Sequence, residues 1–162
     1  MISRKPPVLK YFSLLLFIYF LEKMKTYYDK MTSYIKPTIV CVKVSNIRKN
    51  KKDTHVNLKT WMADENNVYI GRKGIVFVPN DTGEKERWPK INSKWCNPYN
   101  LKEYSRDECI DKYRTYIERK IKNNEITIDE LKDLSGKTLG CWCKPEACHG
   151  DVIVEMFEKY LY

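Results

Sequence analysis

Short apolar runs separated by polar loops occupy the middle of the chain and predict a set of strands. Residues 38–44 are rich in β-branched side chains and almost entirely apolar, which is typical of a strand buried on both faces. Residues 67–70 and 75–78 predict two shorter strands, each followed by residues that favour turns. A fourth apolar run, residues 138–142, comes shortly before the C-terminus. These runs together predict a small sheet.

Helical spacing dominates the last third of the chain. Two capping boxes, Ser105 with Glu108 and Thr127 with Glu130, place a hydroxyl and a carboxylate where they can bind the free N–H groups of a helix start. Gly136 suits the C′ position that would end the second, short helix. Apolar residues at helical spacing predict one helix after the first box and another at the C-terminus. They are Cys109, Ile110, Tyr113, Tyr116, Ile117 and Ile121, and then Val152, Ile153, Met156, Phe157, Tyr160 and Leu161.

The order of these elements predicts an α/β fold of layered helices and a short, mainly parallel sheet. In open α/β sheets, ligands bind beyond the carboxyl ends of the strands. The closing strand, loop and helix therefore place the expected site at residues 141–151. We expect residues 36–162 to form one domain.

The N-terminal segment, residues 1–35, is expected to be an extension outside this domain. It contains an apolar run at residues 11–21, which is too short to cross a ~30 Å hydrocarbon layer as a helix. A basic start followed by such a run resembles a signal peptide, but residues 22–30 offer no small-x-small cleavage site. A packed or surface helix and an upstream extension remain the main alternatives. Weak membrane association through residues 11–21 is a third.

Composition narrows the class of protein without identifying it. The 162 residues are 43% apolar and 31% charged, which argues against a disordered chain, a collagen-like chain and a polytopic membrane protein. The net charge is +9, of which residues 1–34 carry a surplus of four. Much of the remainder lies in residues 43–59, which suit either a solvated loop or a surface that attracts phosphate or nucleic acid. The general abundance of lysine in this chain weakens the interpretation as a surface that attracts phosphate or nucleic acid.

The six cysteines are informative because three of them are clustered. Cys141, Cys143 and Cys148 fall within eight positions, whereas Cys41, Cys96 and Cys109 lie apart. This distribution resembles a site more than a disulfide framework, so we expect a reducing, intracellular setting and a soluble protein. Buried packing remains a plain alternative for Cys141 and Cys143, and it is the best interpretation for Cys41 and Cys109.

One interpretation of the cluster is a metal site. Soft thiolates and an imidazole suit tetrahedral Zn²⁺, and Cys141, Cys143, Cys148 and His149 would supply four ligands. The spacing argues against it, since the adjacent Cys148 and His149 are expected to converge on one ion only with difficulty. The chain also lacks a second C-x-x-C pair.

The second interpretation is catalysis or ligand binding at the start of the last helix. Free backbone N–H groups and the helix dipole there would attract an anion and lower the pKa of a thiol. Cys148 and His149 would form a reactive pair, and Asp151 would orient the imidazole or bind a hydroxyl. Gly150 would let a ligand approach the backbone closely. Both interpretations stay open on the sequence.

The same segment resembles the signature of a known family. The residues Gly136-Lys137, Leu139, Cys141-Trp142-Cys143, Pro145 and Cys148-His149-Gly150-Asp151 resemble the C-W-C-x-P-x-x-C-H-G-D motif of domain of unknown function 4326. Residues 44–46, 69–72 and 93–98 and the Tyr113-x-x-Tyr116 helix are also similar to that family. The resemblance covers about residues 38–160. It implies an uncharacterised domain of the kind found in bacteria, phages and large DNA viruses, and in the viral case its location would be the host cytoplasm. A more distant likeness to another uncharacterised α/β family supports a Rossmann-like layered fold by analogy. It implies no assigned reaction.

The upstream pieces share a property that suggests one cleft. Asn46, Arg72, Lys94, Asn97 and His149 follow strands or lie in irregular segments, so we expect them to converge. Arg72 and Lys94 would hold a phosphate, and Asn46 and Asn97 would bond a base or sugar. In the same cleft, Trp95 would stack on a ring.

The resulting hypothesis is a domain that binds or processes a nucleotide, nucleoside or nucleic-acid base at residues 148–151. The alternative is a zinc-stabilised module that binds nucleic acid without catalysis. The sequence leaves open whether the protein is an enzyme, whether zinc is its cofactor, and which nucleotide-like molecule or nucleic acid is its partner. A membrane partner is not expected.

Overall fold

The computed structural model describes residues 8–31, 34–49, 52 and 56–162, and within the first helix it describes the side chains of residues 15–27. The predicted surface at residues 43–59 therefore lies partly outside the described residues, and so does His55. The chain separates into two units, one comprising the residues up to Tyr34 together with Tyr162, and the other comprising Ile35–Leu161.

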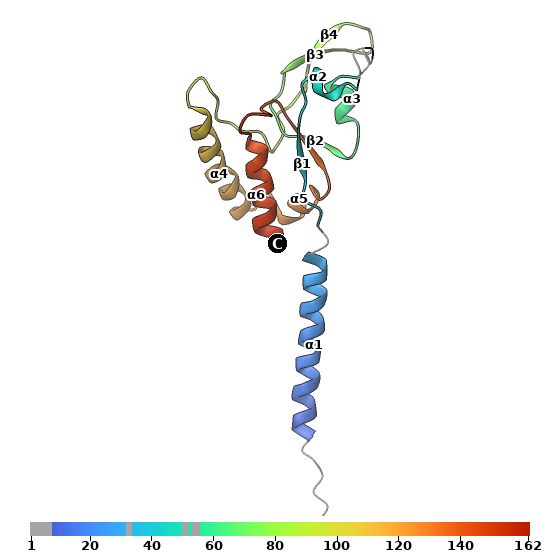
Figure 1. Ribbon diagram of the computed structural model, residues 1–162, viewed down its shortest axis with the longest axis vertical. Coiled ribbons are helices and arrows are strands. Elements are labelled where there is room, and N and C mark those ends of the chain that lie inside the picture. Colours follow the sequence, from blue (N-terminus) through green and yellow to red (C-terminus); the bar gives the residue numbers. More distant parts are fainter. Residues whose placement is uncertain (1–7, 32–33, 50–51, 53–55) are drawn as a thin grey trace, which may run out of the picture. The chain divides into compact units, whose positions relative to one another are not determined.

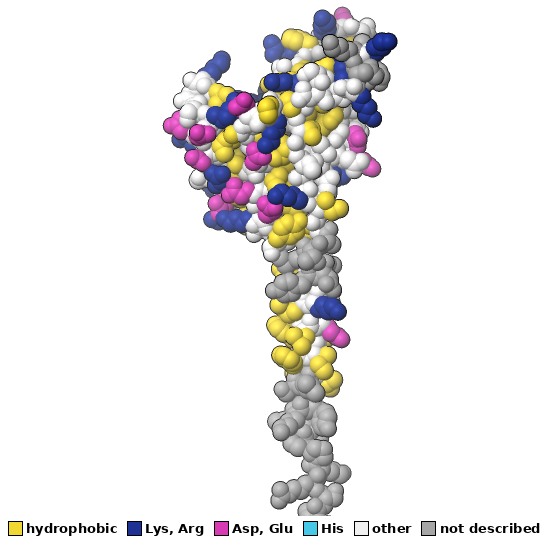
Figure 2. Space-filling view, viewed as in Figure 1, with side chains coloured by type: hydrophobic (Ala, Val, Ile, Leu, Met, Phe, Trp, Pro, Cys, Tyr) yellow, Lys and Arg dark blue, Asp and Glu magenta, His cyan; other side chains and the backbone are white. Residues whose placement is uncertain are grey.

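The N-terminal unit contains one long helix, α1 (Val8–Met31). Its described apolar side chains are exposed, among them Leu15, Phe17 and Phe20, and Figure 2 shows them along much of the described part of the helix. Among the described residues, no helix is both long and apolar enough to cross a membrane.

The second unit is built around a parallel sheet of three strands (Figure 1). β5 (Thr138–Cys141) lies between β1 (Thr38–Cys41) and β2 (Asn67–Tyr69). Cys41 is in register with Cys141, and Tyr69 with Gly140. The predicted α/β fold with a short, mainly parallel sheet is thus confirmed, and the three carboxyl ends meet at one edge.

The segment between β1 and β5 departs from the prediction at two places. The strand expected at residues 38–44 ends at Cys41, and Val44 instead begins α2 (Val44–Ile47). A hairpin of β3 (Val76–Pro79) and β4 (Lys85–Trp88) forms a separate antiparallel sheet. β4 was missed because three of its four residues are charged. The short helix α3 (Leu58–Met62) lies between α2 and the hairpin in the sequence.

Three helices follow the hairpin. α4 (Arg106–Lys122) and α5 (Ile128–Lys132) have Ser105 and Thr127 as N-caps, and both predicted capping boxes are confirmed. Seven residues separate the end of β5 from the start of α6 (His149–Leu161). Gly136 has a positive φ of 70°, but α5 ends at a C-cap on Asp133, so the expectation that Gly136 is its C′ residue is wrong.

The core lies between the sheet and the paired helices α4 and α6. α4 and α6 run side by side (Figure 1), and the apolar faces of both are buried, with Tyr113, Ile117 and Phe157 fully enclosed. The Tyr113 hydroxyl donates a hydrogen bond of 2.7 Å to the carbonyl of Trp95. This bond ties the irregular segment before α4 to the helix that covers the site.

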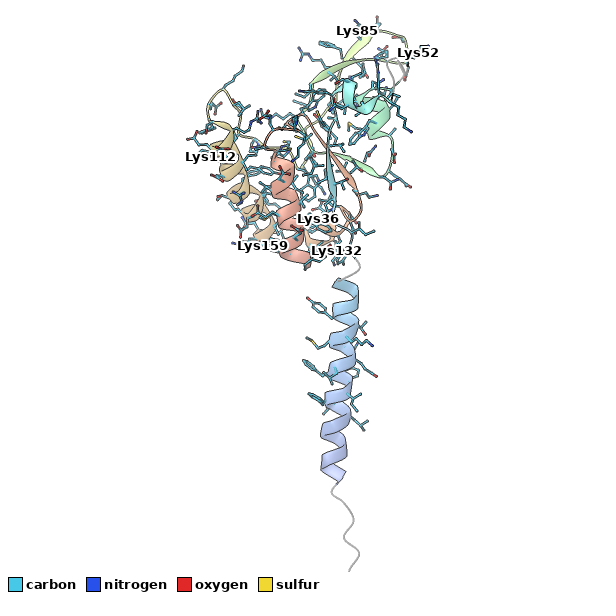
Figure 3. The ribbon with its side chains drawn as sticks, viewed as in Figure 1. Lys36, Lys52, Lys85, Lys112, Lys132 and Lys159 are labelled. Carbon is cyan, nitrogen blue, oxygen red and sulfur yellow. The ribbon has the colours of Figure 1, made fainter. Side chains whose placement is uncertain are left out.

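Lysines are spread over the second unit rather than gathered on one face. Figure 3 places Lys52 and Lys85 at one end of this unit and Lys36, Lys132 and Lys159 at the other. The last three form ion pairs with Glu158, Asp129 and Glu118, respectively. Figure 2 likewise shows Lys and Arg interspersed with Asp and Glu on the viewed face of this unit.

A candidate metal centre and the adjoining pocket

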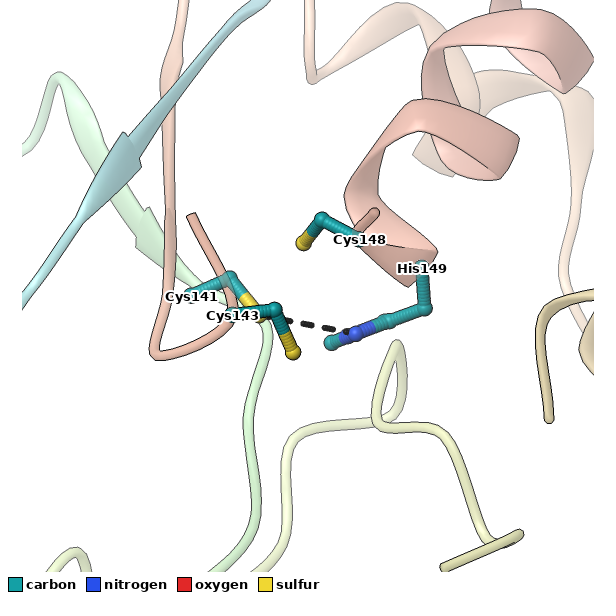
Figure 4. Close-up of side chains that lie close together, drawn as sticks. All are labelled: Cys141, Cys143, Cys148 and His149. Atoms are coloured by element: carbon teal, nitrogen blue, oxygen red, sulfur yellow. Dashed lines mark hydrogen bonds between the residues drawn. The ribbon is translucent and has the colours of Figure 1, made fainter. Parts of the chain in front are cut away.

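Four side chains with metal-binding atoms converge beyond the carboxyl end of β5. The Sγ atoms of Cys141, Cys143 and Cys148 and the imidazole of His149 all lie within 4.8 Å of one another. Figure 4 shows the four side chains pointing into one small volume between the end of β5 and the start of α6. Sequence reasoning placed the site at this junction, and the structure brings these four residues together there.

The local chain path explains how two adjacent residues can share the centre. Cys141 is the last residue of β5, Cys143 lies in the following loop, and Cys148 directly precedes α6, of which His149 is the first residue. The backbone changes from loop to helix between Cys148 and His149, so their side chains reach the cluster from different directions. The expectation that this adjacent pair converges only with difficulty is therefore wrong.

Both nitrogens of His149 have defined partners. His149 is 5% exposed, and its Nε2 lies 2.8 Å from the carbonyl oxygen of Ile70. A carbonyl oxygen only accepts, so Nε2 carries the proton and Nδ1 presents a lone pair. Nδ1 lies 3.5 Å from Cys141 Sγ, and the Tyr113 ring packs edge-on against the imidazole at 5.2 Å between centroids. His149 thus presents Nδ1 to the cluster while its other nitrogen is anchored, an arrangement that is usual for metal-binding histidines.

The start of α6 is fastened around Cys148. Its Sγ accepts a hydrogen bond of 3.3 Å from the Gly150 N–H, and its own N–H donates to Asp151 at 3.2 Å. Lys144 forms a two-fold contact with the same carboxylate at 2.7 and 2.9 Å. These contacts hold the loop between β5 and α6 against the helix it precedes.

The thiols influence one another strongly. Hydrogen bonds from the Cys141 and Cys148 thiols lower the pKa of Cys143. The bond to Cys143 correspondingly raises the pKa of Cys141, with burial adding to the effect. Three thiols this close cannot all be ionised without a neighbouring cation, because like charges at this distance repel.

A pocket of about 410 Å³ adjoins the cluster. Its walls are mainly apolar, and Cys141, Cys143 and His149 form part of them. The two cationic side chains that line it are Arg72 and Arg106, and none of its described lining residues is an aspartate or a glutamate. The other lining residues are Gly71, Ile75, Asn97, Tyr99, Asn100, Leu101, Cys109, Ile110, Trp142 and Ala147. A cavity of this size and character suits a small organic ligand.

Two residues expected to bind a ligand do line this pocket together with His149. Arg72 donates from Nε to the carbonyl of Asn97 at 2.9 Å and from Nη2 to the carbonyl of Tyr99 at 2.5 Å. The Asn97 amide donates to the Cys109 carbonyl at 3.1 Å. Arg72 therefore orders one wall of the pocket while retaining donors that these two bonds do not use.

The other expected ligand-binding residues lie outside the pocket lining. Lys94 pairs with Glu130 at 2.6 Å, and Trp95 is 3% exposed, so that ring packs in the core. Asn46 is exposed and accepts a bond from Ser45. Gly150 lies within the first turn of α6, where a Cβ would lie 3.0 Å from Ile70 Cδ1.

The three residues expected to be catalytic have other contacts. Cys148 is 1% exposed, and both nitrogens of His149 are engaged as described. Asp151 bonds Lys144 and the Cys148 N–H, which places it at the helix start rather than in the pocket wall. The side chains of Cys148 and His149 are placed where they could serve as metal ligands.

Sequence reasoning missed Arg106 and Trp142 as pocket residues. Arg106 follows the Ser105 cap at the start of α4, and its Nη1 donates to the Ala147 carbonyl at 3.2 Å. Trp142 stands between two of the clustered cysteines, and its indole N–H donates to the Tyr69 hydroxyl at 3.1 Å. The position of Trp142 inside the motif was the one available signal for it.

The fold and site thus define an α/β domain with a three-cysteine, one-histidine cluster beside a mainly apolar pocket. Comparison with known families matches residues 54–159 to the family described as Domain of unknown function (DUF4326), so the chain belongs to this family and the resemblance seen in the sequence is confirmed. Neither the family description nor its relatives' names state a reaction.

Two similar proteins come from viruses. The "Uncharacterized 12.4 kDa protein in nrdA-td intergenic region" of Enterobacteria phage T4 is 38% identical over 65 residues, which cover 40% of this chain and 60% of that protein. "Uncharacterized protein R718" of Acanthamoeba polyphaga mimivirus is 31% identical over 126 residues, which cover 70% of this chain and 80% of that protein. No solved structure matches the chain.

Proposed function

We propose that this domain binds one Zn²⁺ through Cys141, Cys143, Cys148 and His149, and that the adjoining pocket binds a nucleotide-like small molecule. The observation that carries the zinc proposal is the convergence of four suitable ligand atoms within 4.8 Å, with His149 anchored through its other nitrogen. Three thiolates and one imidazole form a donor set typical of tetrahedral structural zinc.

The distances fit that geometry. A tetrahedral ion with Zn–S bonds of ~2.3 Å and a Zn–N bond of ~2.0–2.1 Å holds its sulfur and nitrogen ligands about 3.5 Å apart. The separation of Cys141 Sγ and His149 Nδ1 is 3.5 Å. Pairs of sulfur ligands would lie about 3.8 Å apart, so the widest separation, 4.8 Å, would close by about 1 Å on binding.

The proposed ion would join the end of β5 to the start of α6 across the intervening loop. All four ligands come from the described segment between Cys141 and His149, so the ion would fix the loop that forms one wall of the pocket. A site with four protein ligands supplies folding stability in the first place.

The character of the pocket supports a nucleotide-like ligand. Apolar and aromatic walls that include Tyr99, Ile110 and Trp142 suit a flat heterocycle, and Arg72 and Arg106 suit a phosphate. Among the described lining residues there is no carboxylate that would repel an anion. The proposed ligand roles of Arg72 and Asn97 fit this placement, whereas Asn46, Lys94 and Trp95 lie elsewhere.

The two parts of the proposal are tested separately. Metal analysis of the purified chain should find one zinc per chain, and Cys148→Ser should reduce this value while the matched buried variant Cys109→Ser leaves it unchanged. In a thermal-shift screen of nucleosides and nucleotides, Ile110→Trp should abolish the stabilisation seen with the wild type because the indole fills the pocket. Equal zinc content in both cysteine variants would refute the metal centre. Ligand stabilisation that persists in Ile110→Trp would refute the pocket.

A further inference from the structure

The four residues of the cluster differ in exposure. Cys141 is 2% exposed, Cys148 1% and His149 5%, whereas Cys143 is only half-buried and also lines the pocket. A molecule in the pocket can therefore reach the sulfur of Cys143 more readily than that of either other cysteine in the cluster.

We propose that Cys143 is a metal-activated nucleophile that accepts an alkyl group from a neutral ester bound in the pocket. This inference rests on the zinc binding and the pocket proposed above. Metal coordination keeps a thiol deprotonated at neutral pH and is one of the established ways in which proteins activate a nucleophile.

The charge of the centre favours such reactivity. Three thiolates, a neutral imidazole and Zn²⁺ carry a net charge of −1, so the sulfur atoms retain electron density. In the described part of the chain, a backbone N–H bonds the sulfur of Cys148, but no backbone N–H bonds that of Cys143. Hydrogen bonds around a metal site tune the basicity of its ligands, and the sulfur of Cys143 lacks the backbone hydrogen bond that reduces the basicity of Cys148.

The pocket also indicates which alkyl donors fit. Arg72 and Arg106 line it without an accompanying carboxylate among the described lining residues, so a cationic donor such as a sulfonium would be repelled. A neutral ester is accepted, and its leaving group departs as an anion that a guanidinium can bind. Arg106 is tethered to the carbonyl of Ala147, the residue before Cys148, by one of its five N–H donors.

The proposed step balances without a further reactant. A lone pair of Cys143 Sγ forms a bond to the alkyl carbon while the carbon–oxygen bond of the ester breaks. Both electrons of that bond leave on the oxygen, so the negative charge passes from sulfur to the departing oxyanion. Cys143 becomes a neutral thioether, no proton is transferred, and nothing is oxidised or reduced. The reaction is stoichiometric, one alkyl group per chain.

The experiment exposes the zinc-loaded full chain to trimethyl phosphate and follows the methylation of each cysteine by peptide mass spectrometry. Cys96 is the internal control because it is also half-buried but lies outside the cluster. We expect Cys143 to be methylated at least about tenfold faster than Cys96, as metal activation requires. Trimethylsulfonium, normalised to its rate with free glutathione, should show no such preference.

Two variants and a metal assay sharpen the result. Arg106→Gln should slow methylation of Cys143 by the phosphate ester, whereas Arg119→Gln, an exposed arginine near the other end of α4, should not. Equal rates at Cys143 and Cys96, or a normalised preference for trimethylsulfonium, would overturn the inference. Zinc content measured on the same samples separates the failures: a chain without zinc refutes the metal centre, whereas a zinc-loaded chain with an unreactive Cys143 refutes only this inference.

Discussion

The Nε2 atom of His149 lies 2.8 Å from the carbonyl oxygen of Ile70, so the first residue of α6 is bonded to the residue that follows β2. This bond directs Nδ1 toward the three cysteines. It also joins α6, which follows the central strand β5, to the end of the neighbouring strand β2. The proposed metal centre is therefore anchored to the fold through a residue distant in sequence.

That anchoring predicts a difference between two substitutions of His149. His149→Ala should lower zinc affinity because it removes a ligand, and His149→Cys should restore part of it by supplying a fourth thiolate. Competition with a chromogenic chelator measures both affinities. If the two variants hold zinc as tightly as the wild type, His149 is not a ligand.

Removal of the metal should loosen one particular region. Chelation should lower the melting temperature and increase hydrogen exchange in the loop between Cys141 and His149, because zinc bound only by the folded state stabilises that state. Exchange in the α4 segment around Ile117 should change less, since that helix supplies no ligand. A uniform change over the domain would contradict a local role for the ion.

The hydroxyl of Tyr113 should contribute to stability independently of zinc. Tyr113→Phe leaves the buried carbonyl of Trp95 without its 2.7 Å donor, and loss of such a partner costs about 1–3 kcal/mol. Urea unfolding measures the loss, and Tyr116→Phe on the same helix is the control. Zinc stoichiometry should stay the same, because the ring that packs on His149 is retained.

Gly140 should tolerate no side chain. A Cβ at this position in β5 would collide with the Trp61 ring and with Val42. Gly140→Ala should therefore destabilise the domain by about 1–3 kcal/mol, the usual cost of overpacking. Adding Trp61→Phe should recover part of this loss because the smaller ring leaves room. If the two changes are simply additive in urea unfolding, the proposed collision is absent.

An ion-pair network between α4 and α6 predicts a pH dependence. Hydrogen bonds from Lys122 and Lys159 lower the pKa of Glu118 from 4.5 to about 2. A lowered pKa in the folded state stabilises it above pH 4.5, and this contribution is lost as the pH falls toward 2. The melting temperature of Glu118→Gln should thus approach that of the wild type over this range. A difference in melting temperature that stays constant over this range would contradict the prediction.

Local patterns predicted much of this structure. Both capping boxes and the central strand β5 are visible in short stretches of sequence because hydrogen bonding and apolar spacing within each stretch define them. The position of the cysteine cluster was also visible, because its cysteines lie close together in the sequence. β4 was not, because its charged residues form a strand only through pairing with β3.

The detailed arrangement of the site depends on contacts between residues that are distant in sequence, and no local sequence pattern reveals these contacts. The convergence of Cys148 and His149 depends on the bond from His149 to Ile70, 79 residues away in sequence. Trp95 resembled a stacking ring in the sequence, but the packing of α4 buries it. Arg106 contributes to the pocket because the start of α4 approaches the loop before α6.

X-ray absorption at the zinc edge of the metal-loaded chain tests the central claim most directly, since it reports the atoms bound to the ion and their distances. The account predicts three sulfur ligands at ~2.3 Å and one nitrogen ligand at ~2.0–2.1 Å. A first shell made only of oxygen and nitrogen, or one containing fewer than three sulfur atoms, would contradict it.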